Sequence, residues 1–151
     1  MLFRSPVVAT LDGDPYPQII FGYDCAGVPG QDCYTTYHRG GGYVTALKHT
    51  GQVAAGWPRF VPGQVVWSTP AVGDLYGDGR KEVVVGTGLY WAAPAGNQVL
   101  AFDSHGKTLV GFPVAVNGRT FSSPALGDVL GTGKPQIAIG VENGTDRKSV
   151  V

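Results

Sequence analysis

The residues best placed for chemistry lie in a short acidic turn between two apolar runs. Asp74, Asp78 and Glu82 are spaced four apart, with Gly77 and Gly79 among them. Alternate side chains of a tight loop can point inward, and their carboxylate oxygens, joined by a backbone carbonyl, suit calcium. The same residues also suit a plain turn, in which aspartate accepts hydrogen bonds from backbone amides and glycine takes a positive φ. Cation binding and turn formation are therefore the two interpretations of this segment.

The acidic turn belongs to a stretch, residues 69–86, that occurs three times in the chain. Residues 5–22 and 123–140 align with it without a gap, from a Ser-Pro or Thr-Pro start to a closing apolar run and glycine. A second element at residues 42–58 matches residues 97–113. One unit is therefore expected to contain strand, acidic turn, strand, variable loop, strand, hairpin turn and strand, over about 54 residues.

The apolar runs inside these units indicate strands that are buried on both faces. Residues 19–21, 83–85 and 137–139 lack the alternation of a strand with one wet face. The 24 glycines and 11 prolines leave few segments long enough for a helix. We therefore expect an all-β fold, a partial β-propeller of four-stranded antiparallel blades. The competing architecture, a β-sandwich, would bury one face of each strand and would not need the repeat.

The expected organisation is a single propeller fragment over residues 1–151, with about two and a half blades. Its units are about 5–61, 65–116 and 119–151, and the third is expected to stop after two strands. Trp57 and Phe112 occupy equivalent positions before a proline, so we expect both between blades. Trp67, which precedes the second repeat, is expected there as well.

The repeated string resembles the FG-GAP/VCBS repeats, the blades of integrin-alpha-like propellers and of many bacterial secreted proteins. It runs Ser/Thr-Pro-Ala-Val/Leu-Gly-Asp, a glycine turn, an apolar run and glycine, then Val-x-Ala and a late aromatic-Pro. Phe21-Gly22 retains the Phe-Gly element, whereas Ser-Pro or Thr-Pro replaces Gly-Ala-Pro. The resemblance implies a blade fold and an extracellular or cell-surface setting, as part of a longer secreted protein. It implies much less about a ligand, because propellers host many functions.

Members of this family often carry a calcium loop of pattern D-x-D-x-D-G-x-x-D, which assigns ligand positions in each unit. The second unit offers the fullest set, Asp74, Asp78, Glu82 and the backbone carbonyl of Arg80. Tyr76 fills the remaining ligand position there and is the defect in the pattern. The first unit offers the weaker pair Asp12 and Asp14, because Pro15 replaces the glycine and fixes φ. The third unit keeps Asp128 alone.

Two variable loops, residues 23–42 and 87–96, combine aromatic and polar side chains that suit a glycan or protein ligand. The candidate ligand-binding residues are Tyr34, Tyr37, Arg39, Tyr90 and Trp91. Both loops join the second and third strands of a unit, so both are expected on one face. The alternative is that these aromatic rings cover blade edges. Cys25 and Cys33, in the first loop, would form a disulfide in an oxidising compartment, or else remain free thiols.

Charge and composition narrow the classes of function that the chain can have. The 11 basic and 11 acidic residues are scattered, which argues against a nucleic-acid partner. No apolar run is long enough for a membrane span, and the chain shows no signal peptide.

We expect a non-catalytic binding or scaffold module of a secreted or cell-surface propeller, with structural calcium. Its expected partners are further blades, from the same parent chain or through self-assembly, and a glycan or protein ligand. The alternative is a propeller domain of a polysaccharide-active enzyme, a lyase or hydrolase, with its site in loops 23–42 and 87–96.

Overall fold

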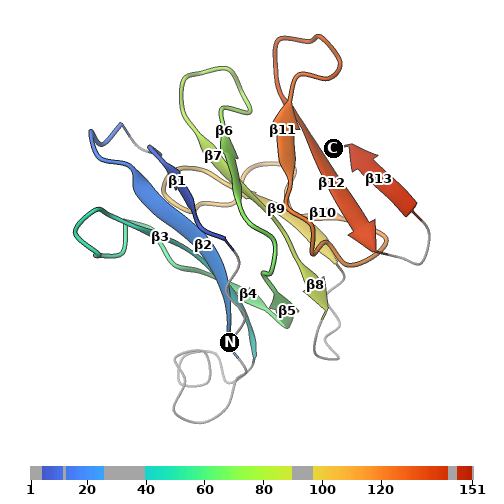
Figure 1. Cartoon of the computed structure of the whole chain (residues 1–151), viewed down its shortest axis with the longest axis horizontal. Helices are drawn as coiled ribbons and strands as arrows, with labels where there is room; N and C mark the ends of the chain where they lie inside the picture. The colour runs from blue at the N-terminus through green and yellow to red at the C-terminus, as the bar shows by residue number, and fades with distance from the viewer. Residues whose placement is uncertain (1–4, 12, 26–39, 90–96, 143–145, 151) are drawn as a thin grey trace.

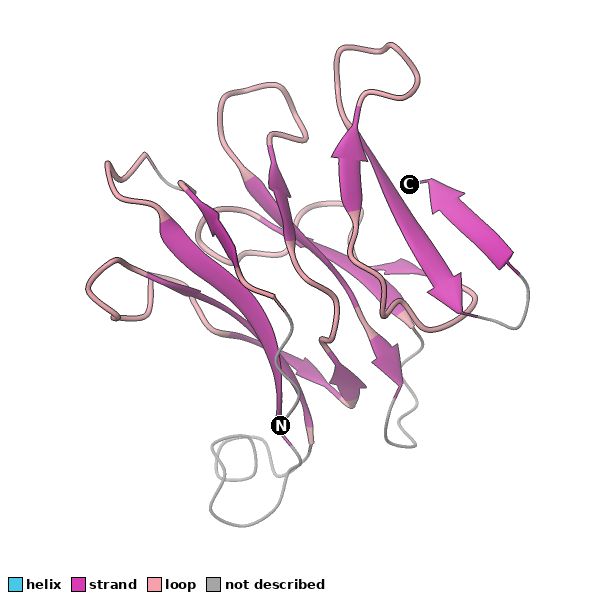
Figure 2. Cartoon of the chain, viewed as in Figure 1, coloured by secondary structure: helices cyan, strands magenta, loops and turns pink. Residues whose placement is uncertain are grey.

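The computed structural model describes residues 5–11, 13–25, 40–89, 97–142 and 146–150, and every regular element in them is a β-strand (Figure 1, Figure 2). The strands are β1 (Val7–Ala9), β2 (Gln18–Cys25), β3 (Gly41–Leu47), β4 (Arg59–Pro62), β5 (Gln64–Val65), β6 (Ala71–Gly73), β7 (Glu82–Gly86), β8 (Gly88–Leu89), β9 (Gln98–Phe102), β10 (Val114–Ala115), β11 (Ala125–Gly127), β12 (Gln136–Glu142) and β13 (Asp146–Val150). No helix in this part of the chain is long and apolar enough to cross a membrane.

The strands form three larger antiparallel sheets that follow the sequence repeat. Sheet 1 has the order β1-β2-β3-β4, sheet 2 the order β6-β7-β9-β10, and sheet 3 the order β11-β12-β13. A fourth pair, β5 and β8, lies beside them. Figure 1 shows the three larger sheets side by side, with sheet 2 in the middle. The predicted four-stranded antiparallel units are thus confirmed for the first two repeats, whereas the described strands close no ring.

The prediction that the third unit stops after two strands is wrong. Strand β13 pairs with β12 over five residue pairs, from Ala138 opposite Val150 to Glu142 opposite Asp146. Its sequence, Asp-Arg-Lys-Ser-Val, is mostly charged and polar. Hydrophobic patterning therefore gave no signal for this strand, whose backbone pairs at the edge of the sheet.

Two hydrophobic layers hold the three sheets together, and β7 contributes to both. Val83 and Val85 lie in a core that also contains Ile20 of sheet 1, whereas Val84 lies in a second core with Ile139 of sheet 3. All three β7 valines are fully buried. A strand with a sheet on each side has no wet face, and this explains why its sequence does not alternate. Each buried valine side chain contributes about 1.5–3 kcal/mol through removal of apolar area from water.

Trp57 joins sheets 1 and 2, as its position before a proline predicts. Its ring is buried and meets Phe102 edge-on, with centroids 5.7 Å apart. Its Nε1 donates a hydrogen bond to the carbonyl of Ser104 at 3.1 Å. Phe112, the equivalent residue of the next unit, is half-buried against the core between sheets 2 and 3. Both residues precede a cis proline.

A serine hydroxyl at the same repeat position extends the edge pairing of β6 in the second unit and of β11 in the third. The Ser68 Oγ donates to the Gly86 carbonyl and accepts from the Gly86 amide, both at 2.9 Å. The Ser122 Oγ donates to the Gly140 carbonyl at 2.7 Å. Glycine is favoured at position 86, because a Cβ there would lie 2.5 Å from the Oγ1 of Thr120, in the segment between β10 and β11.

Candidate functional site

The acidic turn of the second unit is organised by Asp74, which follows β6. The Asp74 Oδ1 accepts hydrogen bonds from the Gly77 and Asp78 amides at 2.6 and 3.1 Å, and Oδ2 accepts from the Gly79 amide at 2.7 Å. Gly77 and Gly79 adopt φ of 73° and 85°, which their lack of a Cβ permits. The Gly79 hydrogen bond is the largest influence that lowers the pKa of Asp74; burial opposes it, and the Asp78 and Gly77 amides add to it.

The third unit builds the same turn with a single carboxylate. The Asp128 carboxylate accepts hydrogen bonds from the Thr132 and Gly133 amides at 2.8 and 2.7 Å. These two amides are the largest causes that lower the pKa of Asp128. Gly131 and Gly133 again take positive φ, 67° and 78°. The turn geometry therefore forms with one aspartate, and it does not require the full acidic set of residues 74–82.

Glu82, at the start of β7, closes the turn from its other side. Its Oε2 accepts a hydrogen bond from the Leu75 amide at 2.7 Å. Gln18, the equivalent residue of the first unit, uses Oε1 in the same way and accepts from the Leu11 amide at 2.8 Å. In the third unit, the Gln136 Oε1 accepts at 3.1 Å from the amide of Leu130, one residue later in the turn. Only 3% of Glu82 is exposed, and desolvation is the main cause that raises the pKa of its carboxyl. A glutamine makes the shared hydrogen bond without that desolvation of a charge.

The predicted calcium ligands do not gather into a metal centre in the described part of the chain. No group of three or more His, Cys, Asp and Glu side chains there is placed to hold a metal ion. Besides the Asp74 contacts, the Asp78 Oδ1 accepts a hydrogen bond from the Arg80 amide at 2.9 Å, and Tyr76 is 45% exposed. In the first unit the Asp14 Oδ1 accepts from the Tyr16 amide at 3.0 Å. Asp12 lies outside the described residues.

A cavity of about 480 Å³ lies between these turns and the hairpin turn of the second unit. Leu11 and Gly13 line it from sheet 1, and Glu82 and His105 line it from sheet 2. The His105 Nδ1 lies 3.0 Å from the Ser104 Oγ, within hydrogen-bond distance. The cavity thus combines carboxyl and imidazole groups at the turn end of the sheets.

The two variable loops leave the opposite end of the sheets. Strand β2 ends at Cys25, and β8 ends at Leu89. Cys25 is disulfide-bonded. The predicted residues of these loops, Cys33, Tyr34, Tyr37, Arg39, Tyr90 and Trp91, lie outside the described residues.

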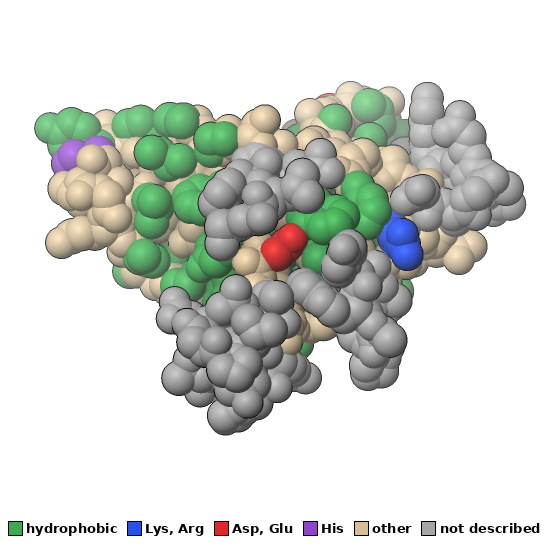
Figure 3. Space-filling model, turned by 60° about the horizontal axis from the view of Figure 1, so that its bottom comes forward, with side chains coloured by type: hydrophobic (Ala, Val, Ile, Leu, Met, Phe, Trp, Pro, Cys, Tyr) green, Lys and Arg blue, Asp and Glu red, His purple; other side chains and the backbone are tan. Residues whose placement is uncertain are grey.

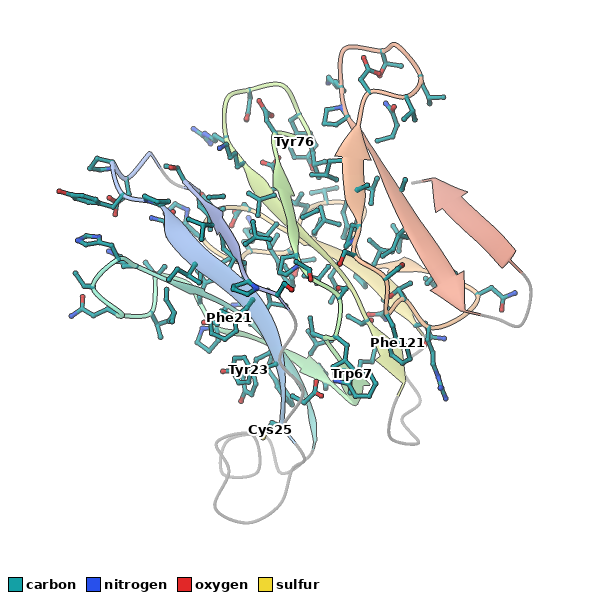
Figure 4. All side chains as sticks on the ribbon, in the orientation of Figure 1. Phe21, Tyr23, Cys25, Trp67, Tyr76 and Phe121 are labelled. Carbon is teal, nitrogen blue, oxygen red and sulfur yellow. The ribbon has the colours of Figure 1, made fainter. Side chains whose placement is uncertain are left out.

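Beside the roots of these loops, the structure assembles a group that we name the Trp67 cluster: Asp24, Trp67, Arg119 and Phe121. The Trp67 Nε1 donates a hydrogen bond to the Asp24 Oδ2. The Trp67 and Phe121 rings lie 5.0 Å apart between centroids and are tilted by 39°. The Arg119 Cζ lies 5.9 Å from the Phe121 centroid, within range of a cation–π contact. Figure 4 shows Trp67 and Phe121 at the same end of the molecule as Cys25.

The surface at the Trp67 end of the sheets combines apolar, acidic and basic side chains. Figure 3 shows a hydrophobic patch with one acidic group inside it and one basic group at its side. Trp67 contacts both neighbouring units, as its predicted place between blades requires. Its ring is nevertheless half-buried and belongs to neither of the two cores between the sheets, so the expectation of a buried core position is wrong. Trp67 and Phe121 occupy the same position in successive repeats, a signal that could have identified the pair. Nothing local marked Asp24 and Arg119, since each comes from a different unit.

A row of aromatic rings continues from this end along sheet 1. The Tyr23 and Tyr43 rings are stacked with centroids 5.0 Å apart and an interplanar angle of 17°. Phe60 lies 5.0 Å from Tyr43, and Phe21 lies 6.0 Å from Tyr23. Tyr23 and Tyr43 are directly opposite each other across β2 and β3, which is why the rings can stack.

Comparison with known proteins gives little direct guidance. No protein-family model matches the chain, and no curated protein matches it. Among solved structures, the chain is similar to the V. cholerae biofilm matrix protein Bap1, with 17% sequence identity and a TM-score of 0.33. The alignment covers 97% of this chain and 26% of the Bap1 chain. The chain thus spans about a quarter of that structure's length, and a likeness at this TM-score carries no argument about fold or function.

Proposed function

We propose that this chain is a non-catalytic binding module of a secreted or cell-surface protein, built from consecutive blades of an FG-GAP/VCBS-like β-propeller. Three antiparallel sheets that follow one another in sequence and pack through two apolar layers support the blade arrangement. The repeated Asp turn, the Gln or Glu that closes it, and the serine at the sheet edge support a common unit. Further blades would cover the outer faces of sheets 1 and 3.

The Trp67 cluster is the observation that carries the binding proposal. Two aromatic rings offer faces on which a pyranose can stack, and Arg119 can donate hydrogen bonds to its hydroxyls. Asp24 holds the Trp67 ring in place, because its Oδ2 accepts the hydrogen bond from Nε1. One acid and one base flank the rings, so the cluster has no net charge. A neutral polyhydroxylated ligand matches that balance better than a strongly charged one. We therefore assign a glycan to this end of the sheets.

A glycan array probed with the full chain tests this assignment. Trp67→Leu and Phe121→Leu remove the stacking faces, and Tyr76→Leu is a matched loss of an exposed aromatic ring at the opposite end. Loss of an anchor ring is expected to weaken binding by about thirtyfold, or about 2 kcal/mol. Tyr76→Leu should bind as the wild type does. Equal binding by all three variants would remove the cluster from the site, and the loop variants Tyr37→Ala and Trp91→Ala would then be compared.

The enzyme alternative is separated from binding by turnover. A lyase or hydrolase with its site in loops 23–42 and 87–96 would cleave a pectin-like polymer or a glucan and so produce new chain ends. The binding module is expected to retain its glycan unchanged over the same incubation. Catalytic release of product, abolished by the loop variants, would favour the enzyme.

A further inference from the structure

A separate cavity of about 200 Å³ lies between sheets 1 and 2, along strands β4 and β9. It shares no lining residue with the Trp67 cluster or with the acidic turn. Val61 on β4 and Leu100 and Phe102 on β9 supply buried apolar wall. The cavity is smaller than the roughly 300–1,000 Å³ of sites for drug-sized ligands, so its ligand would be smaller as well.

Gln64 brings an amide group to this cavity from a buried position. Its side chain is 1% exposed, and its Oε1 accepts a hydrogen bond from the Thr87 hydroxyl. Thr87 is itself fixed, because its carbonyl accepts from the Thr120 hydroxyl at 2.6 Å. With Oε1 held in this way, Nε2 has no hydrogen-bond partner in the described part of the chain. The Nε2 amide group can therefore donate a hydrogen bond to a ligand acceptor in the cavity.

Arg59 is the one charged side chain among the described residues that line the cavity. It is exposed, and it makes no ion pair or side-chain hydrogen bond in the part of the chain that the structure describes. Its stem lies over Gly106, where a Cβ would come within 2.9 Å of the Arg59 Cδ. The glycine therefore makes room for this stem beside the cavity.

We propose that this cavity binds a small carboxylate with an apolar body. Arg59 pairs with the carboxylate, the Gln64 Nε2 donates a hydrogen bond to it, and the apolar walls contact the body. A cationic ligand would be repelled by Arg59 and would find no acid among the described lining residues. A neutral ligand would leave Arg59 without a counter-charge. The proposal is independent of glycan binding at the Trp67 cluster, because the two sites have different residues.

Isothermal titration of the full chain with phenylacetate tests the proposal. A ligand of this size is expected to bind with a Kd on the order of 1 mM. Phenylacetamide keeps the shape but loses the charge, and acetate keeps the charge but loses the body, so both should bind at least about tenfold more weakly. Absence of saturable phenylacetate binding at about 20 mM, or equal affinity for phenylacetamide, would overturn the proposal.

Two variants locate the binding. Arg59→Gln removes the guanidinium from an exposed position and should weaken phenylacetate binding at least about tenfold. Lys134→Gln removes an exposed positive charge outside the cavity and should leave the affinity unchanged. Thr108→Tyr places a larger side chain in the cavity and should abolish binding, while the circular dichroism spectrum confirms the fold. Wild-type affinity in either Arg59→Gln or a folded Thr108→Tyr would show that phenylacetate binds elsewhere, and the proposal would fail.

Discussion

The Ser68 hydroxyl is expected to hold the edge of sheet 2 where the main-chain pairing of β6 and β7 ends. That pairing stops at Ala71 opposite Val84, two residues before the end of β7. Beyond it, the Ser68 Oγ both donates to the Gly86 carbonyl and accepts from its amide. Both residues are buried, so water cannot replace the hydroxyl. One side chain therefore satisfies two buried backbone groups.

Ser68→Ala removes both hydrogen bonds and leaves buried polar groups without partners. The net loss of a hydrogen bond is about 0.5–1.5 kcal/mol, and leaving a buried group unsatisfied costs about 1–3 kcal/mol more. We therefore expect the free energy of unfolding to fall by about 2–4 kcal/mol. For a chain of this size, that corresponds to a Tm lower by about 5–12 °C.

Ser122→Ala is the matched control, since Ser122 occupies the same repeat position. Its Oγ donates one hydrogen bond, to the Gly140 carbonyl, and both residues are exposed, so water can replace the hydroxyl. The expected loss is about 1 kcal/mol or less. Urea unfolding, followed by circular dichroism and tryptophan fluorescence, measures both variants, with an unchanged slope against urea as the check on two-state behaviour. A Ser68→Ala loss below about 1 kcal/mol, or an equal loss in Ser122→Ala, would refute the reasoning.

Three further predictions follow from the repeated elements. Gly86→Ala should lower the free energy of unfolding by about 1–3 kcal/mol, measured in urea, because the added Cβ overpacks against Thr120. Gly127→Ala should lower it much less, since nothing lies within 4 Å of the added Cβ, and equal losses in the two variants would contradict this. The pKa of Asp128 is lowered in the folded chain, so the stability that this carboxylate contributes is present above its unfolded pKa and is lost as pH falls through its folded pKa. Asp128→Asn should therefore make the Tm fall less steeply with decreasing pH in the acid range. An unchanged acid range of the Tm–pH curve would contradict this prediction. Calcium is expected to raise the Tm of the wild type but not of Asp78→Ala, and no shift in the wild type would remove the predicted ion site.

The acidic turn illustrates how far residue types alone could lead. Its sequence predicts both a turn and a calcium site, and the two predictions use the same carboxylates. The structure assigns the Asp74 oxygens to three backbone amides and one Glu82 oxygen to a fourth. The turn is therefore observed, whereas calcium binding stays a prediction that the Asp78→Ala titration tests. Comparison of repeats pointed the same way, because Asp128 forms its turn with a single carboxylate.

The sequence by itself determined the elements that depend on near neighbours. The repeat, the central strands buried on both faces, and the Asp–Gly turns could all be predicted, because apolar runs and turn residues act through local backbone geometry. It could not predict β13, whose polar side chains carry no burial signal and whose backbone pairs with β12.

Only the tertiary structure decided which side chains meet across different units. Asp24, Trp67 and Phe121 come from three separate repeats, and the stacking of the sheets brings them together. Arg59 on β4 and Gln64 on β5 likewise line one cavity together with residues of β9. Such contacts depend on the offset between whole sheets, which many weak packing contacts determine together. No short pattern along the chain encodes that offset, so the Trp67 cluster and the cavity could be identified only from the tertiary structure.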